Sequence, residues 1–354
     1  MSAPKWIAAL LLILTTPAFA APAPKPLVWV FSTGGTISGA GSSPTDLSNY
    51  TSGKLTGADL IKGLPQLADV AEIKAEQITN ISSNDMTTAI WLTLARRINE
   101  VLADPSTAGV VVTHGTSTLE ESAYFLNLTV KSDHPVVMVG AMRPSTAISA
   151  DGPLNLLNAV RVAASPEARG KGVMIVLNDE INSARDATKT NTYRVETFRA
   201  PEMGILGYVD EDKIAFYRST TKRHTINSEF DVRALKTLPG VDIVYSYVEP
   251  KVEMFQALVK AGDKGIVFAG MGAGGLSKFE KDAVIAMNAA KGPKPILVRA
   301  SRTGNGRVVA TSQYEEVGML PADNLNPQKA RVLLMLALTK TSDPKEIRRI
   351  FAEY

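Results

Sequence analysis

The sequence predicts two α/β domains, a larger N-terminal one on a doubly wound, mostly parallel sheet and a smaller C-terminal one. Three observations lead to this expectation. The chain has 354 residues, more than one ordinary domain usually holds. Short apolar runs alternate with longer amphipathic runs, the pattern of βαβ units. The alternation pauses once at a polar stretch, residues 218–239, which we expect to link domains at 21–217 and 240–354.

The strands expected in the first domain are short and almost continuously apolar, which suits parallel strands covered on both faces. They lie at residues 27–32, 109–113, 135–139 and 173–177. Helical periodicity marks residues 86–102, 118–128 and 154–164. The same alternation returns after the linker, with strands expected at 242–245, 265–269 and 296–299 and helices at 252–261, 277–290 and 326–338.

The N-terminus has the features of a signal peptide. Lys5 supplies a positive charge, and residues 6–14 form an apolar run too short to span a bilayer. Small residues at Ala18 and Ala20 suit a signal peptidase. We therefore expect residues 1–20 to be removed and the protein to be periplasmic or secreted. No later stretch of the sequence is long and apolar enough to predict a membrane span.

The composition excludes several classes of site. With no cysteine there is no disulfide, thiolate zinc site or cysteine nucleophile. The three histidines lack metal-binding spacing, so no metal is expected, and Gly-x-Ser-x-Gly is absent. Basic and acidic residues are mixed, with a formal net charge of +3, so a nucleic-acid partner is not expected.

The first motif that could carry chemistry is TGGTI at residues 33–37, directly after the first expected strand. Ligands of open parallel sheets bind beyond the carboxyl ends of strands, and glycines let the backbone approach them closely. Thr36 would present its hydroxyl there. The alternative is a strand-to-loop turn in which Thr36 has a structural role.

The second motif is HGTSTLEE at residues 114–121, which also follows a buried strand and opens a helix. Ser117 and Glu120 have the spacing of a capping box, so Ser117 has a structural interpretation. The free N–H groups of the helix start favour a substrate carboxylate or an oxyanion. His114 is expected to be structural rather than a base.

The third motif is DATKTN at residues 186–191. A lysine in a polar loop usually lies at the solvated surface. If Lys189 instead folds back towards the second motif, with a lowered pKa, its amine could accept a proton from a threonine hydroxyl.

A competing motif is the Gly-x-Gly-x-x-Gly run at residues 270–275, between an expected strand and helix, as in dinucleotide-binding folds. The next strand, however, ends in Arg299 rather than in the acid that would hold a ribose. A tight strand-to-helix turn explains these glycines better.

Together, TGGTI at 33–37, HGT at 114–116 and KTN at 189–191 resemble the bacterial type II asparaginase family. Residues 134–159 and 325–338 are similar to it too, so the resemblance covers nearly the whole mature chain. It implies an amidohydrolase acting on L-asparagine, possibly also glutamine, without metal or organic cofactor. It also implies a homotetramer of close dimers with active sites between subunits.

The resemblance also implies the roles of individual residues. Thr36 would attack the side-chain amide with Tyr50 assisting, and water would then cleave the acyl-enzyme. Thr116 and Lys189 would form a second catalytic pair. The residues expected at the substrate-binding side are Ser83, which would hold the α-carboxylate, Asn84, Gly115 and Ser117.

Several positions depart from the family pattern. Ser117 stands where the family has the acid that binds the substrate's α-ammonium. Asn84 replaces the usual glutamine, and Gly275 replaces an asparagine. The acid lent by a neighbouring subunit has no clear counterpart; Gln313 lies near its place, with Glu315 and Glu316 close by.

These departures leave two alternatives beside hydrolysis of asparagine. One is the same chemistry on an amide without a free α-ammonium. The other is a periplasmic protein that binds an amide-bearing solute without turnover. Retention of all four catalytic positions favours an enzyme.

Overall fold

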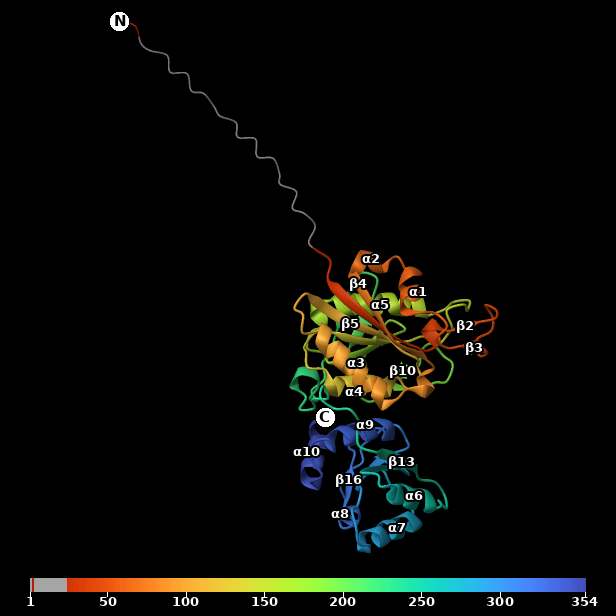
Figure 1. The fold of residues 1–354 in the computed structure, drawn as a ribbon, viewed down its shortest axis with the longest axis vertical. Helices are drawn as coiled ribbons and strands as arrows, with labels where there is room; N and C mark the ends of the chain where they lie inside the picture. The colour runs from red at the N-terminus through yellow and green to blue at the C-terminus, as the bar shows by residue number, and fades with distance from the viewer. Residues whose placement is uncertain (1, 3–23) are drawn as a thin grey trace.

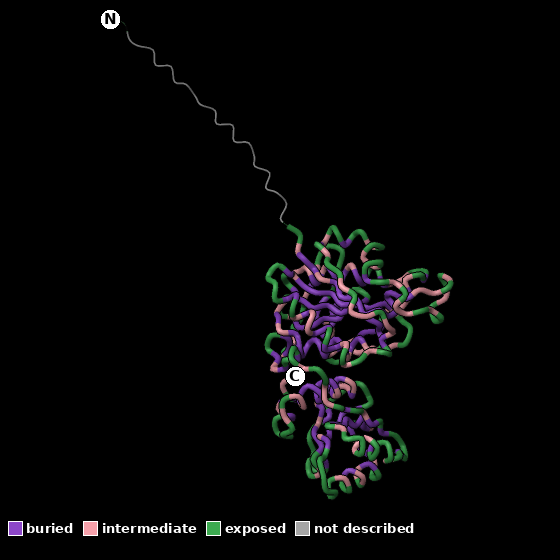
Figure 2. Tube along the Cα trace, in the orientation of Figure 1, coloured by how far each residue is buried: buried purple, intermediate pink, exposed green. Residues whose placement is uncertain are grey.

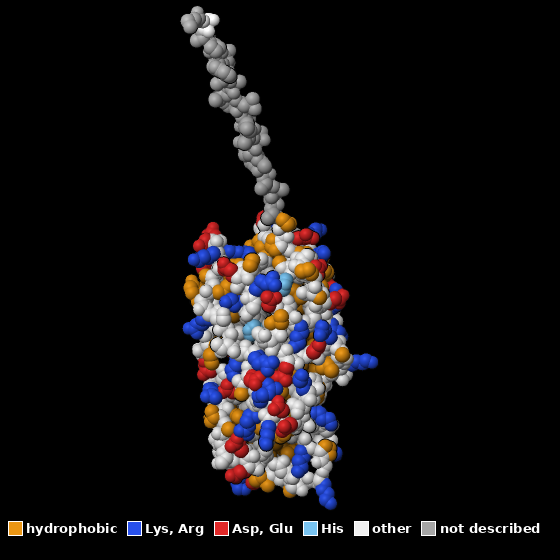
Figure 3. Space-filling model, turned by 90° about the vertical axis from the view of Figure 1, so that its left-hand side faces the viewer, with side chains coloured by type: hydrophobic (Ala, Val, Ile, Leu, Met, Phe, Trp, Pro, Cys, Tyr) orange, Lys and Arg blue, Asp and Glu red, His pale blue; other side chains and the backbone are white. Residues whose placement is uncertain are grey.

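The computed structural model describes Ser2 and residues 24–354, which form two large sheets with their covering helices, and two small two-stranded sheets (Figure 1). The expected signal peptide lies almost wholly outside the described residues. In the described part of the chain, no helix has the length and apolar character needed to cross a bilayer. Basic and acidic side chains are interspersed over the face seen in Figure 3.

The N-terminal sheet has eight strands in the order β12-β11-β8-β7-β6-β5-β1-β4. The parallel strands are β1 (Leu27–Gly34), β4 (Glu72–Ile81), β5 (Thr107–Thr113), β6 (Val136–Val139) and β7 (Val173–Leu177). The antiparallel strands are β8 (Glu180–Ser183), β11 (Gly207–Val209) and β12 (Ile214–Phe216). Because β4 and β5 flank β1, the strand order reverses beside β1, and such a reversal opens a crevice at the strand ends.

Alternating side chains of each central strand enter two different cores, which is why these strands are apolar throughout. In β5, Val110 and Val112 pack with one cluster and Val111 with the other. The first side is covered by α3 (Thr88–Val101) and α4 (Leu119–Thr129). The second is covered by α1 (Gly57–Lys62), α2 (Leu67–Val70) and α5 (Gly152–Ala164).

The C-terminal sheet is parallel, in the order β13-β14-β15-β16. Its strands are β13 (Val241–Tyr245), β14 (Gly265–Gly270), β15 (Ile296–Ser301) and β16 (Met319–Pro321). The helices of this part are α6 (Glu253–Ala261), α7 (Lys278–Ala289), α8 (Ser312–Glu315), α9 (Pro327–Ala337) and α10 (Pro344–Glu353).

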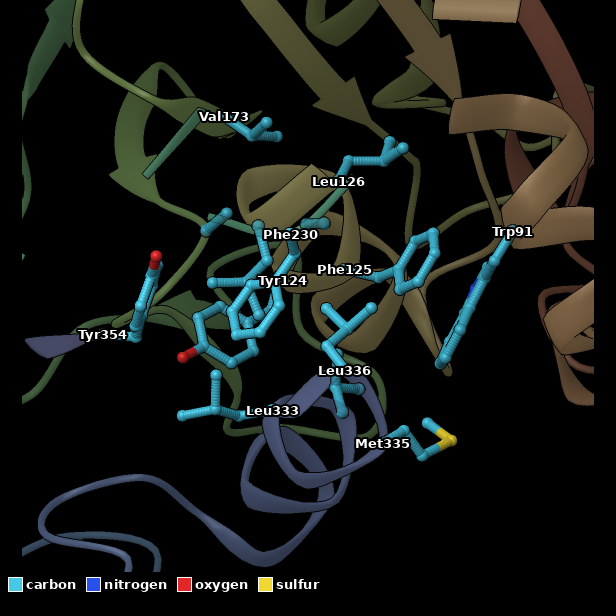
Figure 4. Packing of buried hydrophobic residues seen from close by; sticks show 14 of the residues in the cluster. Trp91, Tyr124, Phe125, Leu126, Val173, Phe230, Leu333, Met335, Leu336 and Tyr354 are labelled. Atoms are coloured by element: carbon cyan, nitrogen blue, oxygen red, sulfur yellow. The ribbon is translucent and has the colours of Figure 1, made fainter. Parts of the chain in front are cut away.

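Helix α9 joins the two sheets into one packed structure. Leu333 and Leu336 of α9 lie against Tyr124 and Phe125 of α4 (Figure 4). One buried cluster extends from the N-terminal sheet through this helix pair to Val267 of β14. Figure 2 shows buried residues on both sides of the junction between the N-terminal and C-terminal parts. The C-terminal part is therefore in direct contact with the helix that follows the second motif.

All seven strands and six helices predicted from the sequence are present, with bounds that differ by a few residues. The polar edge strand β4 and the antiparallel strands were not predicted. The expected linker, residues 218–239, is more ordered than its composition indicates. It contains a short 3-10 helix, Thr225–Asn227, and its Phe230 and Val232 are buried.

Candidate active site

The first two motifs follow adjacent strands, β1 and β5, at the reversal of strand order. Their turns pack against each other so tightly that only glycine fits. A Cβ on Gly35, whose φ is +84°, would lie 2.2 Å from the Cα of Gly115. The paired glycines thus bring the turns that carry Thr36 and Thr116, both buried, into direct contact.

Thr36 lies in a short 3-10 helix (Thr36–Ser38) after β1 and contacts Tyr50. Its Oγ1 lies 2.6 Å from the Tyr50 hydroxyl oxygen, and either group can donate. Tyr50 comes from β3 (Tyr50–Thr51), which pairs with β2 (Ala40–Gly41). This hairpin loop extends from the N-terminal sheet (Figure 1). This contact agrees with the resemblance, which implied that Tyr50 lies close to Thr36.

Lys189 folds back onto the second motif. Its Nζ donates a hydrogen bond of 2.8 Å to Thr116 Oγ1. Lys189 lies in β9 (Thr188–Lys189), which pairs with β10 (Phe198–Arg199). Burial lowers the pKa of the Lys189 amine, while the charge of Glu120 opposes that shift. A threonine hydroxyl beside a partly desolvated lysine can lose its proton to the amine.

Ser83 lies beneath the second turn, in the 3-10 helix Ser83–Asp85. Its buried Oγ accepts a hydrogen bond of 3.2 Å from the Ser117 N–H. A Cβ on Gly115 would lie 2.7 Å from that oxygen, so Gly115 is also required for this approach. The structure thus groups Ser83, Gly115 and Ser117, whereas Asn84, the residue after Ser83, is exposed.

The capping box expected at Ser117 is wrong. Helix α4 begins at Leu119, its N-cap residue is Thr118, and no side chain caps it. Instead, Thr118 Oγ1 donates to the Ser83 carbonyl at 2.8 Å. The Glu120 side chain does not return to the backbone of Ser117, because its carboxylate accepts hydrogen bonds from Asn326 and Gln328 at the start of α9. Ser117 is consequently exposed, with no capping role to restrict its side chain.

His114 is a structural residue, as expected. Trp91 Nε1 donates to Ser122 Oγ at 2.7 Å, and Ser122 Oγ lies 2.9 Å from His114 Nε2. His114 Nδ1 lies 2.8 Å from the Gly115 carbonyl oxygen, which can only accept, so Nδ1 carries the proton. Burial lowers the pKa of His114 to about 4, so the ring is neutral near pH 7.

The Gly-x-Gly-x-x-Gly run is a closed turn. A Cβ on Gly270 would lie 2.6 Å from the backbone of Gly274. Arg299 donates to the Gly274 carbonyl at 3.0 Å. The start of α7 is capped by Ser277 and Glu280, whose side chains occupy its free N–H groups. These contacts explain the glycines without a nucleotide.

Sequence reasoning missed three groups near the second pair: Glu120, Gln328 and Lys329. Lys329 is only 2% exposed although it is charged. The sequence did contain a signal that Lys329 is buried, because Lys329 shares one helix face with the core residues Leu333 and Leu336. Within the described residues, no group of three potential ligands could hold a metal ion.

Comparisons with known proteins agree with this geometry. The family described as "Asparaginase, N-terminal" matches residues 27–222, and "Glutaminase/Asparaginase C-terminal domain" matches residues 240–351. "L-asparaginase 2" of Bacillus subtilis is 53% identical over 93% of this chain and 87% of its own length. "Glutaminase-asparaginase" of Acinetobacter glutaminasificans is 44% identical over 92% of this chain and 99% of its own. A crystal structure titled "Probable Cytoplasmic L-asparaginase from Campylobacter jejuni" has a TM-score of 0.90 at 50% identity, covering 93% of this chain and all of that one.

The sheet therefore carries, where its strand order reverses, the hydroxyl pair Thr36–Tyr50 and the hydroxyl–amine pair Thr116–Lys189. The chain belongs to the asparaginase family and is an amidohydrolase. An amide-binding protein without turnover is thereby set aside.

Proposed function

We propose that this enzyme hydrolyses the side-chain amide of L-asparagine, with glutamine as a further candidate substrate, through an acyl-enzyme on Thr36. The observation that carries the proposal is that the Thr36–Tyr50 and Thr116–Lys189 pairs lie on two turns that contact each other at Gly35 and Gly115. The names of relatives, asparaginases and glutaminase-asparaginases, support the two substrates. Ammonia release from asparagine, glutamine, D-asparagine and N-acylated asparagine tests it.

In the proposed mechanism, Thr36 Oγ1 bonds to the amide carbon as its proton leaves through the hydrogen bond to Tyr50. Backbone N–H groups of the two turns stabilise the oxyanion. The carbon–nitrogen bond then breaks, the nitrogen takes up the proton that Thr36 gave up through Tyr50, and ammonia leaves. Water attacks the carbon of the resulting ester and gives one proton to the Thr116–Lys189 pair. The bond from that carbon to Thr36 Oγ1 then breaks, this proton passes to Thr36 Oγ1, and the acid is released.

A second candidate substrate is an amide without a free α-ammonium. The specific observation is Ser117, whose exposed hydroxyl stands where the family's carboxylate would bind that cation. A charge-assisted hydrogen bond contributes about 1.5–3 kcal/mol. Its loss corresponds to roughly ten- to a hundredfold weaker binding of the α-ammonium. Serine still accepts one hydrogen bond, so asparagine remains a substrate.

Replacing Ser117 by aspartate is expected to raise kcat/KM for L-asparagine by roughly ten- to a hundredfold, because the new carboxylate meets the α-ammonium. The exposed side chain should tolerate the change. The measurement is the ratio of kcat/KM for asparagine to that for N-acylated asparagine, before and after substitution. Ser117→Asn, which is similar in size but uncharged, is the matched control. An unchanged ratio in Ser117→Asp would show that Ser117 does not face the amino end.

We propose further that the active site is completed in a homotetramer of close dimers. The acidic residues near the place of the family's lent acid lie on α8 and just after it, and Glu315 pairs with Arg348 of α10. Figure 1 places α8 at the far end of the C-terminal part from β2 and β3. Glu315, Glu316 and Gln313 therefore cannot reach Thr36 of their own chain, so only those of a neighbouring chain could contribute.

We also propose that the mature enzyme begins at Ala21 after export to the periplasm, with residues 218–239 linking its two domains. The support is the N-terminal pattern and a 46% identical relative from Haemophilus influenzae named "Probable L-asparaginase periplasmic". Intact-mass spectrometry of the periplasmic fraction should find a protein that starts at Ala21. A product that keeps residues 1–20 would contradict this prediction.

A further inference from the structure

Glu120 occupies a buried position between the second catalytic pair and α9. It is 7% exposed and lies one turn beyond Thr116, at the start of α4. Its carboxylate accepts hydrogen bonds from Gln328 Nε2 at 2.9 Å and from Asn326 Nδ2 at 3.4 Å. Both donors belong to the C-terminal part, so this acid is oriented from outside the N-terminal sheet.

Lys329 completes this contact from the same helix. Its Nζ lies 4.0 Å from Glu120 Oε2 and donates to the carbonyls of Arg185, at 2.8 Å, and of Ala187. Those carbonyls belong to the loop that leads directly into Lys189. One buried ammonium therefore contacts both the acid and the backbone that positions the proposed proton acceptor.

Charged residues close to Lys189 in sequence or on the paired strand β10 form ion pairs of their own. Asp186 pairs with Arg185 at 3.0 Å, and Arg199 of β10 pairs with Glu196 and lies 4.0 Å from Glu180. Glu120 lies one turn beyond Thr116, the residue that Lys189 contacts, so its negative charge favours the ammonium form of Lys189. With serine at position 117, the adjacent carboxylate expected from the family pattern is missing, which increases the importance of Glu120.

We propose that Glu120, held by Lys329 and Gln328, is a positioning residue through which the C-terminal part sets the proton affinity of Lys189. This inference rests on the proposed role of Lys189 as proton acceptor. The Glu120 carboxylate favours the ammonium form of Lys189, and the Lys329 ammonium partly cancels that field. Burial lowers the pKa of Lys329 to about 8, so the cancellation is present below that pH.

The test is the pH dependence of kcat for asparagine in Glu120→Gln, Lys329→Met and the double variant. Activity falls as pH decreases through the pKa of Lys189, because the ammonium cannot accept a proton. We call this fall at low pH the acidic limb of the kcat profile. Glu120→Gln removes the negative charge, so the acidic limb should move by about one pH unit to lower pH. Lys329→Met leaves Glu120 uncompensated, so the limb should move by a similar amount to higher pH. The double variant should lie near the parent enzyme, and KM should change little.

Lys278→Met is the matched control, a lysine near the start of another C-terminal helix whose side chain is 83% exposed. Its acidic limb should coincide with that of the parent. Limbs that do not move, or that move in the same direction in both variants, would overturn the inference, and so would a folded Glu120→Gln protein without activity. If Lys329→Met fails to fold, the shift of the acidic limb in Glu120→Gln alone decides whether the inference holds. Full activity of Lys189→Met would instead refute the underlying proton-acceptor role.

Discussion

Replacing Thr36 by alanine is expected to lower kcat for asparagine by at least about 10⁴-fold, because alanine lacks the hydroxyl on which the proposed acyl-enzyme forms. The lost hydrogen bond to Tyr50 contributes only about 1 kcal/mol to stability. Folding and assembly should therefore be nearly unchanged, as measured by thermal unfolding and size-exclusion chromatography.

Thr36→Ser is the matched control for this experiment, since it keeps the hydroxyl and removes only a methyl group. It should retain much of the activity, and a covalent acyl adduct should be trapped by mass spectrometry in it but not in Thr36→Ala. Ordinary turnover by Thr36→Ala would show that the nucleophile is another group.

Replacing Lys189 by methionine should lower kcat by roughly 10²–10⁴-fold, the usual contribution of a positioned general base. The methionine keeps most of the side-chain volume but cannot take a proton from Thr116. The acidic limb of the parent enzyme's pH profile should disappear in the residual activity, since the titrating group is gone. Rates measured across the pH range, with ammonia as the detected product, test both effects.

Two control variants distinguish a proton-accepting role of the Lys189 amine from a role of its positive charge alone. Lys189→Arg keeps a positive charge but has no accessible neutral form, so it should be as impaired as Lys189→Met. Lys213→Met removes an exposed lysine from the turn between β11 and β12 and should leave the profile unchanged. If Lys189→Arg were nearly as active as the parent, the amine would act by its charge rather than as a base.

The sequence by itself determined the layered α/β class, because buried parallel strands must be apolar on both faces. Val110, Val111 and Val112 illustrate this, since neighbouring residues of one strand enter different cores. It also placed TGGTI and HGT directly after expected strands, where they could reach the carboxyl ends of a parallel sheet, and the resemblance implied catalytic roles for their threonines. The edge strand β4 was missed because its exposed, polar residues carry no apolar signal.

Only the tertiary structure decided which of these groups meet. Local spacing favoured a capping box between Ser117 and Glu120, but long-range contacts with Gln328 and Lys329, more than 200 residues away, engage the acid instead. The contact of Lys189 with Thr116 spans 73 residues and depends on the fold of the loop before β9. Such contacts are set by how sheets and helices pack, and that packing joins residues whose separation in sequence carries no periodic signal.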